Sequence, residues 1–491
     1  MERSEVLLTG PTESFMLAHT RNARTMQATD KQQLLEQLPS ITELLKRPEV
    51  ERWQVHHPKA LVVSCVRQAV AQARERALAE GGPAQLTPDA ILAQAGRLLR
   101  QACLPRVRHA INATGIILHT GLGRAVFPAA VVDSMEPELK GYCTLAVDVA
   151  TGERAERDEL VQYLLTELTG AEAATVVNNI AAATMLVLAA MATGREVIVS
   201  RGQLIEIGGS FRLPEVMAQS GAQLVEVGAT NRTHARDYEQ AITQNTAAIL
   251  RVHPSNYRVV GFTSEVELPK LVELAHRHGL LMIDDLGAGA LLDLAQFGLP
   301  AEPTVRASIE AGADLVLFSG DKLIGAGQCG VIVGRQPLID RLRKHPLMRA
   351  VRVDKICLIV LERTLQMFRD PARLPRDHPT YRMICTPMDA LRARGEQLVR
   401  LLAEQAPQVK AELGQSSAYL GSGSLPTEAI PSLELKVSAP NLSAAELSRR
   451  LRLDEACVFG RIEDDVVRLD LRTVTDEQVP AIAAALGRAT A

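Results

Sequence analysis

The 491-residue sequence has few aromatic residues, only 3% of the chain, so we expect a core built from Ala, Leu, Val and Ile. Its seven cysteines are scattered without a C-x-x-C pair, which argues against a disulfide framework or a zinc cluster and predicts reduced thiols. No apolar run reaches membrane-spanning length, and the first residues lack the pattern of a signal peptide. We therefore predict a cytoplasmic protein with no membrane partner and no metal site.

The charge is nearly balanced, at a net −3, but it is unevenly distributed. Residues 1–110 hold 15 Lys and Arg against 11 Asp and Glu, and the rest of the chain is acidic. A mildly basic N-terminal region could bind a polyanion, although so small an excess is weak support by itself. With 47% hydrophobic residues, a chain of this length is typical of a globular protein of two or three domains.

The N-terminal quarter predicts a loose tail followed by a small helical domain. Residues 1–25 show no apolar periodicity, whereas residues 26–106 carry apolar residues at helical spacing. Ser40 and Thr87 are positioned as N-caps. The expected helices lie within residues 30–50, 59–82 and 87–105.

The pattern changes near residue 107. From there to residue 365, short apolar runs alternate with helix-period segments, which predicts an α/β domain with a parallel or mixed sheet covered on both faces. The expected strands are residues 173–177, 195–200, 222–228, 247–253, 280–284, 313–319 and 330–334. A helix pattern over residues 387–413 and short strands after it predict a small α+β domain over residues 366–491.

Two strand ends in the predicted α/β domain carry paired polar residues. Asn178 and Asn179 stand between a strand and a helix, where unpaired N–H groups and the helix dipole bind phosphate. Plain N-capping by asparagine is the common alternative. Asp284 and Asp285 end another strand, and a carboxylate there could hold a protonated ring nitrogen or cap the next turn.

A lysine, Lys322, follows Ser319 where a buried strand meets a glycine-rich loop. A lysine in a partly desolvated cleft has a lowered pKa and can form a Schiff base with an aldehyde. Taken alone, a solvent-facing or phosphate-pairing lysine is the more common case. Together, the lysine, the strand-end carboxylate and the helix N-terminus suit pyridoxal 5'-phosphate, which needs an amine for its aldehyde, an anion for its pyridinium nitrogen and donors for its phosphate.

Three arginines are candidates for binding an anion. Arg349 and Arg352 are three residues apart, which predicts that they share a helical face, and Arg124 lies in a second glycine-containing segment. Arginine forks bind phosphate or carboxylate in bidentate fashion. A basic helix face or salt bridges between subunits would have the same pattern.

Histidines and a cysteine supply weaker candidates. His119 and His253 could act as acid–base groups, although a lone histidine is more often structural. Ser255 and Asn256 follow His253 in a loop that could face the same cleft. Cys329, in the loop after Lys322, could be considered as a nucleophile.

Seven ordered motifs resemble those of the bacterial selenocysteine synthases, the L-seryl-tRNA(Sec) selenium transferases. They are INATGIILHTGLGRA, VVNNIAAA, IVSRGQLIEIGGSFRLPEVM, GATNRTHARDY, HPSNYRVVGF, FSGDKLIGAGQCGVIVG and HPLMRAVRVDK. The similarity extends from about residue 30 to the C-terminus. It implies a fold-type I transferase dependent on pyridoxal phosphate, similar to aspartate aminotransferase. The implied domains are a helical tRNA-binding domain (26–106), a cofactor-binding large domain (107–365) and a small domain (366–491).

The resemblance also implies roles for single residues. Lys322 would be the Schiff-base lysine, and Asp285 rather than Asp284 would be the partner of the pyridinium nitrogen. The residues that would hold the cofactor phosphate are Ser319, Asn178 and Asn179. The residues that match family arginines assigned to the phosphate of selenophosphate are Arg124, Arg349 and Arg352. Cys329 would be incidental, because the family commonly has alanine there.

The implied reaction converts L-seryl-tRNA(Sec) to L-selenocysteinyl-tRNA(Sec) with selenophosphate, by β-elimination through an aminoacrylyl-tRNA intermediate and addition of selenium. The implied partners are seryl-tRNA(Sec), selenophosphate and further copies of the chain in a homodecamer, with no DNA. One alternative is a paralogous pyridoxal phosphate lyase or transferase for a small amino acid, which would not need a tRNA-binding domain. Another is a tRNA-binding protein without catalysis, which would not need Lys322 and Asp285.

Overall fold

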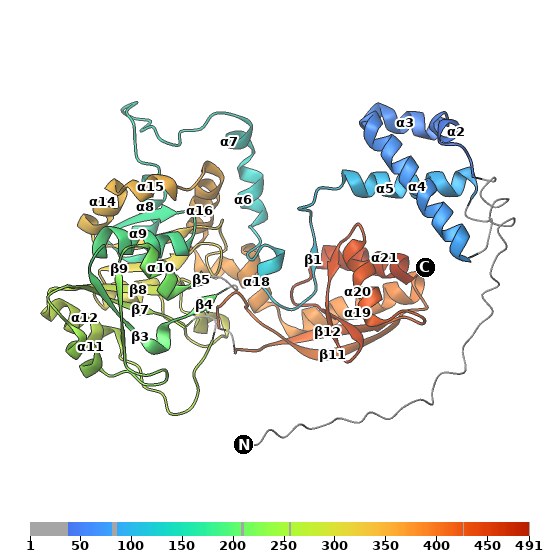
Figure 1. Ribbon diagram of the computed structural model, residues 1–491. Coiled ribbons are helices and arrows are strands. Elements are labelled where there is room, and N and C mark those ends of the chain that lie inside the picture. Colours follow the sequence, from blue (N-terminus) through green and yellow to red (C-terminus); the bar gives the residue numbers. More distant parts are fainter. Residues whose placement is uncertain (1–37, 81–85, 208–210, 255–256, 426, 491) are drawn as a thin grey trace, which may run out of the picture. The chain divides into compact units, whose positions relative to one another are not determined.

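The computed structural model describes residues 38–80, 86–207, 211–254, 257–425 and 427–490. The chain divides into two units, Met1–Arg108 and His109–Ala491 (Figure 1). The predicted tail, residues 1–25, lies outside the described residues. Within the described ranges, no helix combines the length and apolar character needed to cross a bilayer, and no three His, Cys, Asp or Glu side chains are grouped as metal ligands.

The first unit is helical, as predicted. Its described helices are α2 (Ile41–Leu45), α3 (Pro48–His56), α4 (Lys59–Glu80) and α5 (Pro88–Cys103). Both predicted N-caps are confirmed, because Ser40 Oγ and Thr87 Oγ1 accept hydrogen bonds from main-chain N–H groups three residues on. A break at Pro39 and a cap at Ser40 predicted one helix from Ser40 to residue 50, and this is wrong. Pro48 starts a new helix, and the residue before it is extended, as a residue before proline prefers.

A seven-stranded mixed sheet organises the second unit (Figure 1). Its strands, in spatial order, are β2 (Ala173–Val177), β10 (Gly330–Gly334), β9 (Leu315–Ser319), β8 (Leu281–Gly287), β7 (Thr246–Val252), β3 (Glu196–Ser200) and β6 (Gln223–Val227). Strand β10 is antiparallel to both neighbours, and the other pairings are parallel. All seven predicted strands are confirmed, and the carboxyl ends of β7, β8 and β9 meet at one edge.

Helices cover both faces of this sheet, which explains why the strands read as continuous apolar runs. The helices on one face are α8 (Glu159–Thr169), α11 (Ala235–Ala241), α12 (Leu268–Arg277), α13 (Val305–Glu310) and α16 (Lys355–Met367). The helices on the other face are α9 (Ile180–Ala192), α10 (Leu213–Gln219) and α14 (Gln336–Lys344). In β2, Val176 packs on the face covered by α8, α13 and α16, and Val177 packs on the opposite face, covered by α9, α10 and α14.

Further short elements lie outside the seven-stranded sheet. They are β1 (Ile111–Asn112), α6 (Ala129–Ser134), α7 (Glu136–Lys140), β4 (Glu206–Ile207), β5 (Phe211–Arg212), α15 (Pro346–Ala350), α17 (Leu374–Asp377) and α18 (Pro379–Cys385). The segment of the last two helices packs beside the loop that follows β9, where Tyr381 of α18 and His378, which lies between the helices, extend the core.

The C-terminal part builds a second, four-stranded antiparallel sheet. Its strands, in order, are β11 (Lys410–Ala418), β12 (Ile430–Ser438), β15 (Val466–Asp470) and β14 (Arg461–Glu463), and β13 (Val458–Phe459) pairs with β1. Its helices are α19 (Met388–Gln405), α20 (Ala444–Leu453) and α21 (Val479–Thr490). The helix predicted to reach residue 413 is wrong, because Pro407 ends α19 and residues 410–418 pair with β12 along their whole length. Division of the second unit at residue 366 stays a prediction.

Candidate functional site

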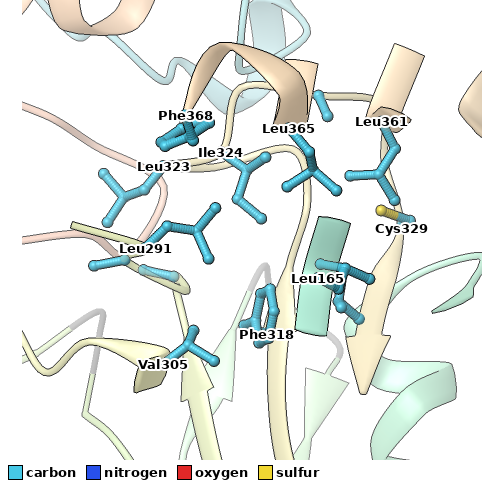
Figure 2. Close-up of a cluster of buried hydrophobic side chains, with 14 of the residues drawn as sticks. Leu165, Leu291, Val305, Phe318, Leu323, Ile324, Cys329, Leu361, Leu365 and Phe368 are labelled. Carbon is cyan, nitrogen blue, oxygen red and sulfur yellow. The ribbon is translucent and has the colours of Figure 1, made fainter. Parts of the chain in front are cut away.

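Lys322 is buried, not solvated, with only 5% of its surface exposed. It lies in the turn after β9, where the Gly325 N–H donates to the Lys322 carbonyl at 3.0 Å. The next two residues, Leu323 and Ile324, are fully buried, and Figure 2 shows them among the core side chains that include Phe318. The turn is therefore anchored in the core, which holds the lysine stem at the carboxyl edge of the sheet.

The surroundings of Lys322 lower the pKa of its amine. Burial lowers the pKa of its ammonium group, and the nearby guanidinium of Arg124 lowers it further. The carboxylates of Asp285 and Asp321 oppose this shift but do not reverse it. A neutral lysine amine is the nucleophile that an aldehyde requires.

An ion pair stands beside the lysine. Arg124 Nη1 lies 2.6 Å from Asp321 Oδ2, and Ser319 Oγ donates to the other carboxylate oxygen at 2.8 Å. Arg124 itself has a left-handed backbone (φ 62°), which is uncommon outside glycine. Because the only O–H of Ser319 is already donated, this hydroxyl could bind a phosphate only by exchanging that hydrogen bond.

The two neighbouring aspartates of β8 point to opposite faces of the sheet and have different partners. Asp284 is completely buried, accepting from Arg251 Nη1 at 2.9 Å and from Ser308 Oγ at 2.7 Å. Asp285 accepts from Thr184 Oγ1 at 3.1 Å and from a main-chain N–H, and it has no cationic hydrogen-bond partner among the described residues. Burial raises the pKa of the Asp285 carboxyl to about 6. Asp285 is thus the carboxylate that a cationic ring nitrogen would suit.

The Asn178–Asn179 turn supports both interpretations that the sequence left open, N-capping by asparagine and a phosphate site at the helix N-terminus. Asn179 caps α9, because its Oδ1 accepts from the Ala182 N–H at 2.8 Å. By helix geometry, the N–H groups of Ile180 and Ala181 have no acceptor within the helix and remain suited to an anion. The Asn178 N–H donates to the Val351 carbonyl, so its backbone is already committed.

Arg349 and Arg352 line one cavity of about 450 Å³, but they do not share a helical face. Helix α15 ends at Ala350, and Arg352 lies beyond it in a β-bridge with Val177. The prediction from their spacing was therefore wrong. Its physical reason is that the Val351 carbonyl, which accepts from the turn after β2, ties this segment to the sheet edge as extended chain.

Two arginines that the sequence reasoning missed, Arg154 and Arg157, line the same cavity. Arg157 above all, and then burial, Arg349 and Arg154, lower the pKa of the Arg352 guanidinium. Their only signal in the sequence is a basic pair three residues apart, in the segment TGERAERDEL. Arg124 is not among the residues that line this cavity, so the three predicted arginines are divided between two places.

The histidine candidates differ in environment. The main-chain N–H of His253 donates to the main-chain carbonyl of Asp285 at 2.8 Å. The imidazole Nε2 lies 3.1 Å from Glu302 Oε2 in a polar cavity of about 320 Å³. His119 Nδ1 is buried and has no hydrogen-bond partner in the described part of the chain. Ser255 and Asn256 lie outside the described residues.

The loop from Gly325 to Gly330 carries two further features. It has the G-x-G-x-x-G spacing of a dinucleotide-binding turn. Because it joins the antiparallel strands β9 and β10 and does not open a helix, it is not such a turn. Cys329 is fully buried, and its contact with Cys357 and its burial raise the pKa of its thiol well above the usual range. Such a thiol is unreactive.

The residues fit pyridoxal phosphate. The buried amine of Lys322, whose pKa is lowered, and the buried carboxyl group of Asp285 interact electrostatically at one sheet edge. In the described part of the chain, no cation hydrogen-bonds to the Asp285 carboxylate, and the pyridinium nitrogen would supply one. The start of α9 offers donors for a phosphate, and Ser319 would add its hydroxyl by exchanging its hydrogen bond to Asp321.

Two family models match the chain. One is described as L-seryl-tRNA selenium transferase and matches residues 110–475, and the other is described as selenocysteine synthase N terminal and matches residues 35–74. The L-seryl-tRNA(Sec) selenium transferase of Geobacter sulfurreducens is 43% identical over 458 residues, covering 92% of this chain and 98% of that protein. The protein of the same name from Methylocella silvestris is 45% identical over 449 residues, covering 90% and 95%.

One solved structure, that of D-glucosaminate-6-phosphate ammonia-lyase, has a TM-score of 0.54 at 22% sequence identity. The match covers 80% of this chain and 97% of that one. At this identity the likeness concerns the fold alone. The predicted fold, that of the fold-type I transferases dependent on pyridoxal phosphate, is confirmed.

Proposed function

We propose a function from one premise: the chain belongs to the L-seryl-tRNA selenium transferase family. It is an enzyme that depends on pyridoxal phosphate and converts L-seryl-tRNA(Sec) to L-selenocysteinyl-tRNA(Sec). The observation that carries this function is the buried amine of Lys322, which interacts electrostatically with the Arg124–Asp321 ion pair and with the Asp285 carboxylate. A tRNA-binding protein without catalysis would not need to bury a lysine in this way.

When bound, pyridoxal phosphate supplies an aldehyde for amino groups and a ring that withdraws electrons from Cα. Lys322 would anchor it and, once its Nζ is released by the incoming seryl amino group, would accept the Cα proton. Asp285 would remain ionised beside the ring nitrogen and keep it protonated. The start of α9, Asn178, Asn179 and Ser319 would hold the phosphate.

Selenophosphate, the proposed selenium donor, is an anion, and the five arginines that line the 450 Å³ cavity support its binding. Arg349 and Arg352 would contact its phosphate group, as the family resemblance implies. Arg124 would act beside Lys322, where its guanidinium already pairs with Asp321. This division gives the donor and the reacting lysine separate arginines.

The helical first unit would bind the tRNA. Arg67 and Arg74 are exposed seven residues apart on α4, and Arg97 and Arg100 are exposed on α5, which supports contacts to a phosphate backbone. The rival, a lyase or transferase for a small amino acid, would have no use for this unit. We expect Arg67→Glu with Arg74→Glu to raise KM for the tRNA while leaving cofactor binding unchanged.

A homo-oligomer, by resemblance a decamer, is proposed on the distribution of apolar surface. Nine of the eighteen exposed large apolar side chains in the described residues lie between Val126 and Tyr163. Tyr142 and Val149, in the loop after α7, are among the most exposed. A concentration of this kind is typical of a protein interface. Native mass spectrometry should give a ten-chain mass, and a monomer would contradict the proposal.

We propose a cytoplasmic location because the cysteines are free thiols. All seven cysteines are free, and several are buried in the core, as in proteins of a reducing compartment. Detection of the native protein in a cytoplasmic fraction, separate from membrane and periplasmic markers, would test this.

The deciding experiment measures selenophosphate-dependent conversion of seryl-tRNA(Sec), ordinary seryl-tRNA and free serine by the full chain. We expect turnover of seryl-tRNA(Sec) alone. Equal use of both tRNAs would contradict the specific function, and turnover of free serine without tRNA would favour the rival lyase or transferase.

A further inference from the structure

A side chain outside the cofactor site contacts the turn that carries Lys322. His378, between α17 and α18, is completely buried, and its Nε2 lies 2.9 Å from the carbonyl oxygen of Ile324. Ile324 is two residues after the lysine, and Figure 2 shows it in the core near Phe368. His378 is 54 positions further along the chain than Ile324, so this contact is made only by the fold.

The fit of the imidazole against the turn is close. Gly325 has a left-handed backbone (φ +74°), and a Cβ at this position would collide with the His378 ring. Phe368 and Tyr381 pack edge-on against the ring, with centroids 5.9 Å and 5.1 Å away. The ring is therefore held in one orientation by its neighbours.

The protonation state of His378 suits a donor. Burial lowers the pKa of its imidazole to about 4, so the ring is neutral at ordinary pH. Because the partner of Nε2 is a carbonyl oxygen, the hydrogen of the neutral ring must be on Nε2. The Nδ1 atom has no side-chain or main-chain partner in the described residues, so the bond to Ile324 is the hydrogen bond that orients the ring.

Two hydrogen bonds thus fix the turn that follows the lysine. Within the turn, the Gly325 N–H donates to the Lys322 carbonyl; from outside, His378 donates to the carbonyl of Ile324. A reacting group must be held within a fraction of an ångström by packing and hydrogen bonds of its supports. A lysine that exchanges its bond partner during a reaction needs its backbone to stay in place.

We propose that His378 is a positioning residue for Lys322: its Nε2–H holds the Ile324 carbonyl and so keeps the lysine amine in its buried location near Asp285. The inference rests on the proposed role of Lys322, but its first test does not depend on that role. It requires only that the turn, and with it the environment of the amine, changes when the donor is lost.

The test compares three variants of the full-length, cofactor-free protein. His378→Phe fills the site without a donor, and His378→Gln replaces the ring with a side chain that can donate. Tyr381→Phe is the matched control, because the Tyr381 hydroxyl in the same aromatic cluster has no hydrogen-bond partner in the described residues. The readouts are acylation of Lys322 as a function of pH and hydrogen exchange at the Gly325 amide, both by mass spectrometry.

With His378→Phe, we expect the apparent pKa of Lys322 to rise and Gly325 exchange to become about tenfold faster, as for loss of one buried hydrogen bond. His378→Gln should recover most of this, and Tyr381→Phe should match the original chain. If His378→Phe lowers the melting temperature but leaves both readouts unchanged, His378 is merely structural and the proposal is wrong.

If His378→Phe does not fold, His378→Leu, which also lacks a donor, takes its place. Exchange at Gly325 in folded His378→Leu that equals the exchange in Tyr381→Phe would overturn the proposal. Neither readout uses tRNA or selenophosphate. Failure of selenium transfer in the wild-type chain would refute the proposed function while leaving this positioning role intact.

Discussion

Arg124 Nη1 lies 2.6 Å from Asp321 Oδ2, and the acid is the residue that precedes Lys322. This pair joins segments 197 positions apart and places one positive and one negative charge beside the buried amine. The two charges act on the lysine in opposite directions, since Arg124 lowers its pKa and Asp321 raises it. The pair therefore tunes the amine as well as joining the two segments.

Removing either charge should shift the pKa of Lys322 in a predictable direction. With Arg124→Gln, the pKa rises, and at pH 8 the amine is acylated more slowly. With Asp321→Asn, the pKa falls further and acylation becomes faster, each change being at most about tenfold for one pKa unit. Competitive labelling of the cofactor-free protein measures both rates, with the exposed Arg341→Gln as control. Shifts in the same direction would contradict this account.

Replacing Lys322 with alanine should remove both the colour of the bound cofactor and the activity. We expect conversion of seryl-tRNA(Sec) to fall about a thousandfold or more, because the anchoring amine and the proposed base are lost together. Borohydride reduction of the original chain should attach the cofactor to the peptide that contains Lys322. Lys344→Ala, an exposed lysine at the end of α14, is the control and should keep both properties. Retained yellow colour in the Lys322 variant would refute the assignment.

The sheet and the lysine turn could be predicted because local sequence encodes them. Buried strands are short runs of Val, Ile and Leu, and the turn after β9 is marked by glycines on both sides of Lys322. Strand β11 could not be recognised in this way. It contains Gly414, Ser416 and Ser417, and it forms because its whole length pairs with β12.

The parts of the site that depend on contacts between distant segments could not be predicted from local sequence patterns. Arg154 and Arg157 gain meaning only when the fold brings them to the cavity of Arg349 and Arg352. His378 is another example, since nothing near it in sequence points to Ile324. The alternation of β8 places Asp284 and Asp285 on opposite faces, but only the helices that cover each face decide which carboxylate is paired.

The arginine cavity should govern the affinity for selenophosphate. We expect Arg349→Ala and Arg352→Ala each to raise KM for selenophosphate by roughly ten- to a hundredfold, the effect of one charge-assisted hydrogen bond. KM for seryl-tRNA(Sec) should stay within about twofold of the original value, and added salt should weaken selenophosphate binding. Initial-rate kinetics with Arg341→Ala as control measures this. A rise in KM for the tRNA alone would assign the cavity to RNA phosphates.

The two neighbouring aspartates of β8 should have opposite effects on stability when each is replaced by asparagine in the cofactor-free protein. The pKa of Asp285 is about 6 in the folded chain against 3.8 for an ordinary aspartate, so the folded state binds more protons between these values. Stability therefore falls as pH rises from about 4 to 6, and above pH 6 the ionised carboxylate costs about 3 kcal/mol, which Asp285→Asn removes. Asp284→Asn leaves the guanidinium of Arg251 without its buried counter-ion and should destabilise by about 3 kcal/mol or more.

Urea unfolding at pH 7.5 should show a gain for Asp285→Asn and a loss for Asp284→Asn, and the gain should shrink at pH 4.5. Equal signs for the two variants at pH 7.5 would contradict the assignment of Asp284 to structure and Asp285 to the cofactor.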